Sequence, residues 1–242
     1  MIGIITGASS GIGLGIAKVL ADEGHTVYAV SRTGTTKDPQ EPAGPHIIHI
    51  KGDVCDAKQM QAIVESIVQK ENSLDFLVNN AGITVKRRAE LITDEEFEQV
   101  HKVNVFAPFR LSVICYPYLK KSSHKGRIIN ISSMAAHLGF ELVAPYCSSK
   151  GAIASLTRAL AIEWANDNIC VNSIAPGWFP SELSKQVMDA KRKAQILSRM
   201  PVHAFGDTAD IGGMVAFLLS DHAKYITGVD YNIDGGALAF GF

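Results

Sequence analysis

Short apolar runs alternate with longer amphipathic stretches along the chain, and this alternation limits the possible fold more than any other feature. It is typical of βαβ units, whose strands form a parallel sheet with helices on its faces. The runs are almost continuously Ile, Val and Leu, which predicts strands buried on both faces. The predicted strands span residues 3–6, 26–31, 46–50, 74–79, 126–132, 169–175 and 230–233.

The amphipathic stretches predict helices over residues 11–23, 56–71, 93–119, 145–166 and 207–220. Neither an internal repeat nor a domain boundary interrupts the pattern, so we expect one domain over residues 1–242. Two segments depart from the alternation. Residues 33–45 are rich in turn formers and predict a surface loop. Residues 176–206 are too long for a simple crossover, which predicts a variable substrate segment or lid.

Charge and composition exclude several classes of partner. A net charge of −1 gives no attraction to nucleic acid or to an anionic membrane. No apolar run approaches the roughly 20 residues that a membrane-spanning helix needs. Met1 leads directly into an apolar run, so we expect no leader peptide. The four cysteines lack metal-ligand and redox spacing, which predicts reduced thiols, no metal site and a cytoplasmic location.

A glycine-rich turn, TGASSGIG at residues 6–13, follows the first predicted strand and opens the first predicted helix. Gly7, Gly11 and Gly13 permit a tight turn and a close approach of the backbone to a ligand. The helix N-terminus then offers N–H groups and a positive dipole end to a pyrophosphate. The spacing differs from the commonest motif, so an ordinary turn is the alternative. Its position after an N-terminal strand favours a dinucleotide site.

The end of the second predicted strand indicates which dinucleotide binds, because the adenosine ribose lies there in such folds. A protein that uses NAD usually has an acidic residue at that point for the ribose 2′-hydroxyl. Here Ser31 is small and uncharged, and Arg32 can present a guanidinium to a 2′-phosphate. We therefore predict NADP(H) rather than NAD(H). The alternative for Arg32 is a solvated loop cation.

Tyr146 and Lys150 stand four positions apart in the stretch YCSSK. On a helix, that spacing places both side chains on one face. A free tyrosine has a pKa of about 10, too high for a proton relay near neutrality. An adjacent ammonium stabilises the phenolate, so we expect Lys150 to lower the pKa of Tyr146. The spacing is common by chance, and a solvated helix surface is the alternative.

Other motifs accompany this pair in order: NNAG at 79–82, Asn104, INISS at 129–133, PG at 176–177 and DGG at 234–236. Together with the glycine-rich turn they resemble the short-chain dehydrogenase/reductase family over nearly the whole chain. The resemblance implies a single-domain Rossmann-type α/β fold with a doubly wound, mostly seven-stranded parallel sheet. It also implies an oxidoreductase that moves a hydride between a nicotinamide and a small carbonyl or secondary alcohol, assembled as a homotetramer.

The resemblance assigns catalytic roles residue by residue. Tyr146 would be the general acid or base at the substrate oxygen, and Lys150 would also hydrogen-bond the nicotinamide ribose. Ser132 and Ser133 compete for the substrate-orienting role, and the family's spacing of thirteen residues before the tyrosine selects Ser133. Asn104 would interrupt its helix and hold a water that extends the proton path.

The cofactor contacts that the resemblance implies extend from the glycine-rich turn to the PG motif. Asp53 would contact the adenine, and NNAG would shape the floor of the pocket. Ser181 stands where the family often has a threonine that holds the carboxamide of the nicotinamide. The full set is Gly7, Ser9, Ser10, Gly11, Ile12, Ser31, Arg32, Asp53, Val54, Asn80, Ala81, Gly82, Tyr146, Lys150, Pro176, Gly177 and Ser181.

Two branches of the family are candidates for the substrate. The stretches NNAGITVKRRAE and DGGALAF look more like the branch typified by gluconate 5-dehydrogenase. In that branch Arg87 or Arg88 could pair with the carboxylate of a keto-sugar acid, and a solvated loop is the alternative for both. Length and motifs also resemble the 3-oxoacyl-acyl-carrier-protein reductases of fatty acid synthesis.

The carrier-protein reductases hold an acidic carrier with basic residues beside the site. The corresponding positions here fall near His124 and Asp167, and the second is an anion that would repel such a carrier. Lys121 and Lys125 could compensate for it. The alternative from another functional class is a dinucleotide-binding regulator without turnover, although such proteins usually lose the tyrosine or lysine.

Overall fold

A computed structural model describes residues 1–37, 44, 46–180 and 190–240, and its frame is a seven-stranded sheet. All neighbouring strands pair in parallel, in the order β3-β2-β1-β4-β5-β6-β7. The predicted α/β class and parallel sheet are therefore confirmed, and the sheet is wholly parallel. The strands are β1 (Ile2–Thr6), β2 (Thr26–Ser31), β3 (Ile47–Lys51), β4 (Phe76–Asn79), β5 (Gly126–Ile131), β6 (Ile169–Pro176) and β7 (Asp230–Ile233).

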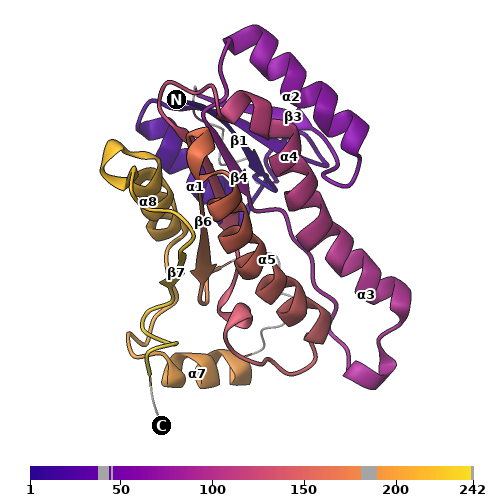
Figure 1. Cartoon of the computed structure of the whole chain (residues 1–242). Coiled ribbons are helices and arrows are strands. Elements are labelled where there is room, and N and C mark those ends of the chain that lie inside the picture. The colour runs from indigo at the N-terminus through magenta and orange to yellow at the C-terminus, as the bar shows by residue number, and fades with distance from the viewer. Residues whose placement is uncertain (38–43, 45, 181–189, 241–242) are drawn as a thin grey trace.

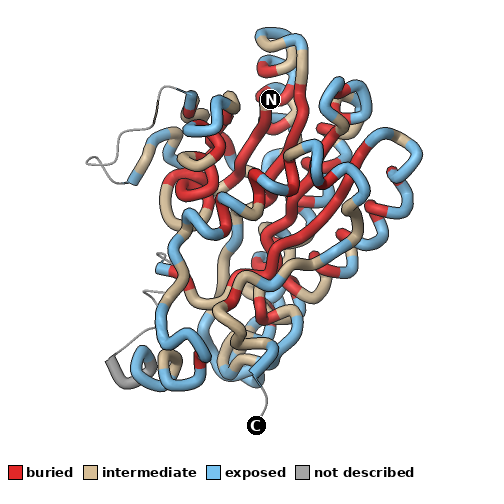
Figure 2. Tube along the Cα trace, turned by 90° about the vertical axis from the view of Figure 1, so that its left-hand side faces the viewer, coloured by how far each residue is buried: buried red, intermediate tan, exposed pale blue. Residues whose placement is uncertain are grey.

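Helices cover both faces of the sheet (Figure 1). On one face, α1 (Gly11–Asp22) and α8 (Thr208–Leu219) pack with residues such as Ile5 and Val78 in one apolar core. On the other face, α2 (Ala57–Glu71), α4 (Ala107–Leu119) and α5 (Ala144–Glu163) enclose a second core. Figure 2 shows the burial concentrated along the strands between these layers. The two cores bury β1, β2, β4, β5 and β6 on both faces, as continuous apolar sequence predicts, whereas the edge strands β3 and β7 are only partly buried.

Local capping explains where several helices begin. The Asp56 side chain accepts a hydrogen bond from the backbone N–H of Gln59 at the start of α2. Thr93 and Glu96 form a reciprocal capping box at the start of α3 (Asp94–His101). Such caps satisfy N–H groups that the helix itself leaves unpaired. Of the helices in the described part of the chain, none is long and apolar enough to cross a bilayer.

The helix predicted over 93–119 is interrupted, as the family resemblance implied at Asn104. After α3 the chain makes a π-helical turn, Lys102–Phe106, and then continues as α4. A π turn inserts one extra residue into the helix and is common at functional sites. Asn104 lies in this turn and is only 1% exposed, so the turn presents a polar side chain to the interior.

The segment of residues 176–206 contains a helix that was not predicted, α7 (Ala190–Arg199), and its role as a substrate segment or lid stays a prediction. The fourth predicted helix ends at Glu163 rather than 166, and a 3-10 turn at Ala165–Asp167 leads to Asn168 in a left-handed conformation. Strand ends otherwise lie within two residues of their predicted positions. From β1 the sheet extends one way through β2 and β3 and the other way from β4 onward, so the strand order reverses between β1 and β4. Ligands of doubly wound sheets bind at the carboxyl ends of the strands where this reversal occurs.

Candidate active site

Tyr146 and Lys150 project from the same side of α5, with the Lys150 ammonium 5.5 Å from the centroid of the Tyr146 ring. The Tyr146 hydroxyl is hydrogen-bonded to Ser133, which directly follows the end of β5. Lys150 Nζ donates to the carbonyl oxygen of Ile131 at 2.7 Å. Helix α5 and the end of β5 thus hold a hydroxyl, a phenol and an ammonium together.

Burial controls the ionisation of this group. It raises the pKa of Tyr146, and the hydrogen bond from Ser133 opposes this effect only in part. Burial also lowers the pKa of Lys150 to about 8, while the carboxylate of Asp230 acts in the opposite direction. The predicted lowering of the Tyr146 pKa by Lys150 is therefore wrong for this structure. The sequence argument considered the neighbouring charge and not the loss of hydration.

Asn104 holds in place the residues that lie behind Tyr146 and Lys150. Its Oδ1 accepts from the Ile83 N–H at 2.9 Å, and its Nδ2 donates to the Ile83 carbonyl at 2.9 Å and to Ser149 Oγ at 3.0 Å. A Cβ placed on Gly82 would lie 3.4 Å from Asn104 Oδ1 and 3.7 Å from Lys150 Nζ. Asn104 therefore ties the loop after β4 to α5 next to the lysine. Its role in holding a water stays a prediction.

The two candidate serines point to different partners. Ser132 Oγ lies 2.7 Å from Asp230 Oδ1 and 3.0 Å from the carbonyl oxygen of Ile174. Ser133 instead contacts Tyr146 and caps the 3-10 helix Met134–Ala136 by accepting from Ala135 N at 3.1 Å. This arrangement supports the choice of Ser133 that the spacing to Tyr146 favoured.

A cavity of about 680 Å³ runs from this group along the carboxyl ends of β1, β2 and β4. Gly7 has φ +68°, and a Cβ there would lie 2.9 Å from the Ala81 Cα. A Cβ on Gly13 would lie 2.4 Å from Asn80 Nδ2. The turn therefore needs glycine at both positions. Ser10 makes no side-chain cap to α1, which leaves the helix N-terminus suited to an anionic group.

Most predicted site residues line this one cavity. Asn104 lies behind the cavity wall rather than in it, and Ser181 lies outside the described residues. The residues that line it are Gly7, Ser9, Ser10, Gly11, Ile12, Ser31, Arg32, Asp53, Val54, Asn80, Ala81, Gly82, Ser133, Tyr146, Lys150, Pro176 and Gly177.

Two cations lie at the far end of the cavity, beyond the end of β2. Arg32 and Lys37 are both exposed and both line the cavity. No ion pair with a carboxylate engages Arg32 among the residues described. Ser31 is buried, and its Oγ accepts from Gly34 N at 3.1 Å, so it shapes the turn. Sequence reasoning missed Lys37, although its position five residues after Arg32 was a usable signal.

Aromatic side chains line the other end, next to Tyr146. Phe140 and Trp178 meet edge to face, with ring centroids 6.2 Å apart, and Val143 and Phe179 complete the wall. None of these four belonged to the predicted site. Nothing in the sequence pointed to Phe140 and Val143, because only folding brings the loop after β5 next to the segment after β6 that carries Trp178 and Phe179.

The arginines considered for a substrate carboxylate pair with acids instead. Arg87 forms an ion pair with Glu96 at 3.1 Å, and Arg88 pairs with Glu90. Neither lines the cavity, so the solvated-loop alternative describes both.

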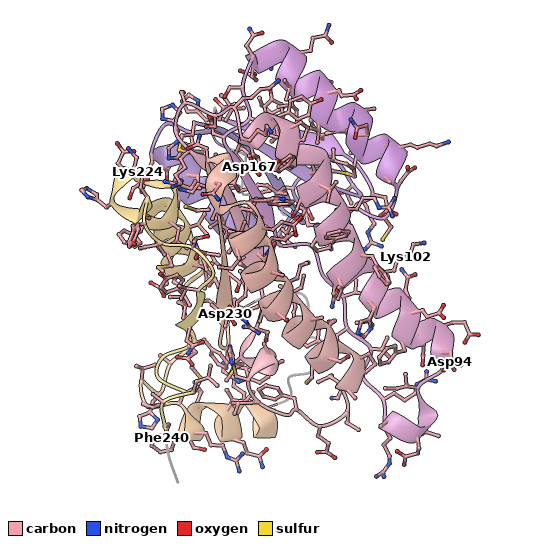
Figure 3. All side chains as sticks on the ribbon, viewed as in Figure 1. Asp94, Lys102, Asp167, Lys224, Asp230 and Phe240 are labelled. Atoms are coloured by element: carbon pink, nitrogen blue, oxygen red, sulfur yellow. The ribbon has the colours of Figure 1, made fainter. Side chains whose placement is uncertain are left out.

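The positions considered for a carrier protein also lie away from the site. His124 and Asp167 precede the first residues of β5 and β6, whereas Ser133 follows the last residue of β5. Figure 3 shows Asp167 in the upper part of the view, with Asp230 well below it. The charges at these positions therefore give no information about substrates at this cavity.

Comparison with known proteins shows which proteins this chain is similar to. The family model described as Enoyl-(Acyl carrier protein) reductase matches residues 7–237. A 2-dehydro-3-deoxy-D-gluconate 5-dehydrogenase of Bacillus subtilis (strain 168) is 36% identical over 98% of this chain and 94% of its own. The chain belongs to the short-chain dehydrogenase/reductase family.

Other members of the short-chain dehydrogenase/reductase family match as well. The 3-oxoacyl-(acyl-carrier-protein) reductase FabG of Staphylococcus aureus (strain Mu50 / ATCC 700699) is 36% identical over 96% of both chains. A solved short-chain type dehydrogenase/reductase from Mycobacterium marinum superposes with a TM-score of 0.88 at 29% identity, covering 98% of this chain and 94% of that one. The protein is thus an oxidoreductase that acts on CH–OH groups with a nicotinamide dinucleotide.

The short-chain dehydrogenase/reductase cofactor fits the cavity described above. The glycine cradle leaves room where any side chain would collide, and the free N-terminus of α1 faces that cradle. The described residues include no cluster of His, Cys, Asp or Glu that could hold a metal ion.

Proposed function

We propose that the protein is an NADP(H)-dependent oxidoreductase that interconverts a small ketone and its secondary alcohol. The carrying observation is the junction of Ser133, Tyr146 and Lys150 at one end of a cavity whose other end presents Arg32. The bound nicotinamide would supply or accept the hydride. The protein's own residues would bind the dinucleotide, orient the substrate oxygen and move its proton.

In reduction, Tyr146 would donate its hydroxyl proton to the substrate oxygen while Ser133 orients that oxygen. The Lys150 ammonium, 5.5 Å from the centroid of the Tyr146 ring, would stabilise the negative charge that develops as the proton leaves, although burial keeps the pKa of Tyr146 above its ordinary value. Asn104 would keep the lysine side of the site closed by holding Ile83 and Ser149 in place. Pro176, Gly177 and Ser181 are proposed to contact the nicotinamide, and Asp53 with Val54 the adenine.

The pH dependence of turnover should report on Lys150. With its pKa lowered to about 8, the ammonium is lost as pH rises through that value. We expect kcat for ketone reduction to fall across this range, because the charge that stabilises the phenolate left by proton donation is lost. Lys150→Arg should move this fall to higher pH, because a guanidinium stays charged. Initial rates between pH 6 and 10 test this, and profiles that are flat across that range would contradict it.

Cofactor choice should depend on Arg32. Losing a charge-assisted contact with the 2′-phosphate costs about 1.5 kcal/mol at an exposed position, which is roughly a tenfold loss of kcat/KM for NADPH. We expect Arg32→Ser to show this loss and to leave kcat/KM for NADH unchanged. Arg158→Ser, an exposed change away from the cavity, is the matched control. Equal effects on the two cofactors would exclude a phosphate contact.

Two substrate classes remain candidates. Similarity to the B. subtilis enzyme over 98% of the chain supports a keto-sugar acid. Equal identity to the S. aureus reductase, and the wall of Phe140, Val143, Trp178 and Phe179, favour a 3-oxoacyl thioester as the second candidate. Assays with NADPH and NADH on both classes, followed by nicotinamide absorbance, discriminate them. Tight dinucleotide binding without turnover of either class, or of simple diketones, would favour the regulator instead.

We also propose a cytoplasmic homotetramer, and an exposed apolar surface supports the assembly. Phe106, Phe109 and Val113, at and after the π turn, are 64%, 44% and 46% exposed, and Ile162 of α5 is 79% exposed. Figure 1 shows α4 and α5 side by side. Apolar surfaces of this kind usually mark contacts between proteins.

Negative charge on that apolar surface should prevent assembly of the tetramer. We expect the double variant Phe109→Glu/Ile162→Glu to elute at a smaller mass than the parent, because association would bury two unpaired carboxylates. Light scattering coupled to size exclusion measures this. Leu91→Glu, at an exposed apolar residue elsewhere, should leave the mass unchanged. A monomeric parent would contradict the tetramer outright.

A further inference from the structure

Asp230, the first residue of β7, makes two side-chain contacts that the proposed reaction does not use. Its Oδ1 lies 2.7 Å from Ser132 Oγ, and its Oδ2 lies 2.8 Å from His137 Nε2. The carboxylate side chain is 8% exposed, whereas that of His137 is 38% exposed. Figure 3 shows Asp230 near the lower part of β7, on the side toward α5. A nearly buried carboxylate is thus held from two sides.

The contact with Ser132 is made at a critical point of the chain. Ser132 stands between two residues that contact the catalytic pair. The carbonyl of Ile131 accepts a hydrogen bond from Lys150, and Ser133 is hydrogen-bonded to Tyr146. The Ser132 backbone N–H also donates to the Ile174 carbonyl at 2.8 Å. Fixing Ser132 therefore fixes both neighbouring contacts of the catalytic pair.

The contact with His137 holds the other end of the same segment. The 3-10 helix Met134–Ala136 follows Ser133, and His137 follows that helix. Asp230 thus spans residues 132–137 as a clamp, with Ser133 inside the spanned segment. A carboxylate can do this because it accepts hydrogen bonds at both oxygens.

We propose that Asp230 is a positioning residue for the Tyr146–Lys150 pair: it clamps the segment that carries Ser133. The inference rests on the proposed function, since it concerns how that same site is held and charged.

A second, electrostatic effect of Asp230 follows from the surroundings of Lys150. Of the described residues, two titratable groups face Lys150: Tyr146 on its own helix and Asp230 on β7. Burial works against the ammonium, and the Asp230 carboxylate works for it by raising the pKa of Lys150. Asp230 itself is faced by His137 from the end of the 3-10 helix. Removing the carboxylate should therefore make Lys150 lose its proton at lower pH.

The first test observes the lysine without turnover. In protein labelled with ¹³C-lysine, the Lys150 Cε resonance is assigned by its absence in Lys150→Arg, and its midpoint is followed from pH 6 to 11. We expect a lower midpoint in Asp230→Asn than in the parent. Asp221→Asn, which removes an exposed carboxylate paired with Lys224, should not move it. An unchanged or higher midpoint in Asp230→Asn would overturn the electrostatic part.

The second test separates the clamp from the charge. Ser132→Ala keeps the carboxylate and its contact with His137 but removes its hold on Ser132, so we expect kcat to fall about tenfold from misplacement of Ser133. KM for the cofactor should stay at the parental value. Parental kcat in Ser132→Ala would overturn the clamp, and this variant also decides the matter if Asp230→Asn fails to fold. His137→Gln, whose amide can still bond the carboxylate, should keep most of the activity.

Failure of this inference can be told apart from failure of the proposed function. If the parent turns over no substrate in the panel, the function is wrong, yet the resonance midpoint still tests the effect of Asp230. If the parent is active and Ser132→Ala keeps the parental kcat, only the inference fails.

Discussion

Tyr146→Phe is expected to lower kcat by about a thousandfold, because general acid–base groups contribute roughly 10²–10⁴ to a rate. The change removes one oxygen and leaves the ring that the Lys150 ammonium faces. The glycine cradle and Arg32 are untouched, so the dissociation constant for NADPH should stay within about twofold of the parental value. Single-turnover absorbance measures the first quantity, and quenching of protein fluorescence by NADPH measures the second.

The control makes the same chemical change elsewhere. Tyr225 is fully exposed, and Tyr225→Phe should keep parental kcat. If Tyr146→Phe retained more than about a tenth of the activity, the phenol would not be the proton donor. If it lost NADPH binding as well, the residue would be holding the cofactor or the fold, and the proposed function would need another acid.

Arg127→Leu is expected to lower the free energy of unfolding by about 3 kcal/mol. Arg127 is completely buried, and its guanidinium donates to the carbonyls of Leu218 at 3.0 Å, Lys125 at 3.2 Å and Ser220 at 3.3 Å. Two of these carbonyls end α8, where a helix leaves acceptors unpaired. A leucine would leave them without a donor in a dry environment, and urea unfolding followed by circular dichroism measures the loss.

A surface arginine provides the comparison. Arg158→Leu, on the exposed side of α5, should change the free energy of unfolding by no more than about 0.5 kcal/mol. Arg127→Leu also removes a buried cation, whose desolvation costs folding free energy, and this gain offsets part of the lost stability. A variant as stable as the parent would show that this gain cancels the lost hydrogen bonds.

The parts of the fold that follow from local pattern could be predicted from the sequence. The five central strands have nearly continuous apolar sequence, and all seven strands were found with ends close to those observed. The apolar pattern alone did not indicate the π turn, which only the family resemblance implied, through Asn104. Helix α7 was missed because AKRKAQILSR is mostly polar and has few apolar residues to mark a buried face.

The site shows a similar division. The residues of the cofactor cradle were predictable because one short motif carries them, and Tyr146 with Lys150 because one helix does. The Ser132–Asp230–His137 cluster joins β5, a 3-10 helix end and β7, and no spacing in the sequence relates them. The direction of the Tyr146 pKa was mistaken for a related reason, as burial depends on the whole fold rather than on the nearest charge.

The π turn has a consequence for how this chain can change in length. The turn holds one residue more than an α-helical turn, so deleting one residue within Lys102–Phe106 would convert it to ordinary α-helix and leave α3 and α4 in register. Asn104 would then lose the wider turn that presents it to Ile83 and Ser149. A single deletion here should therefore preserve the fold and the exposed face of α4 while it disturbs the site.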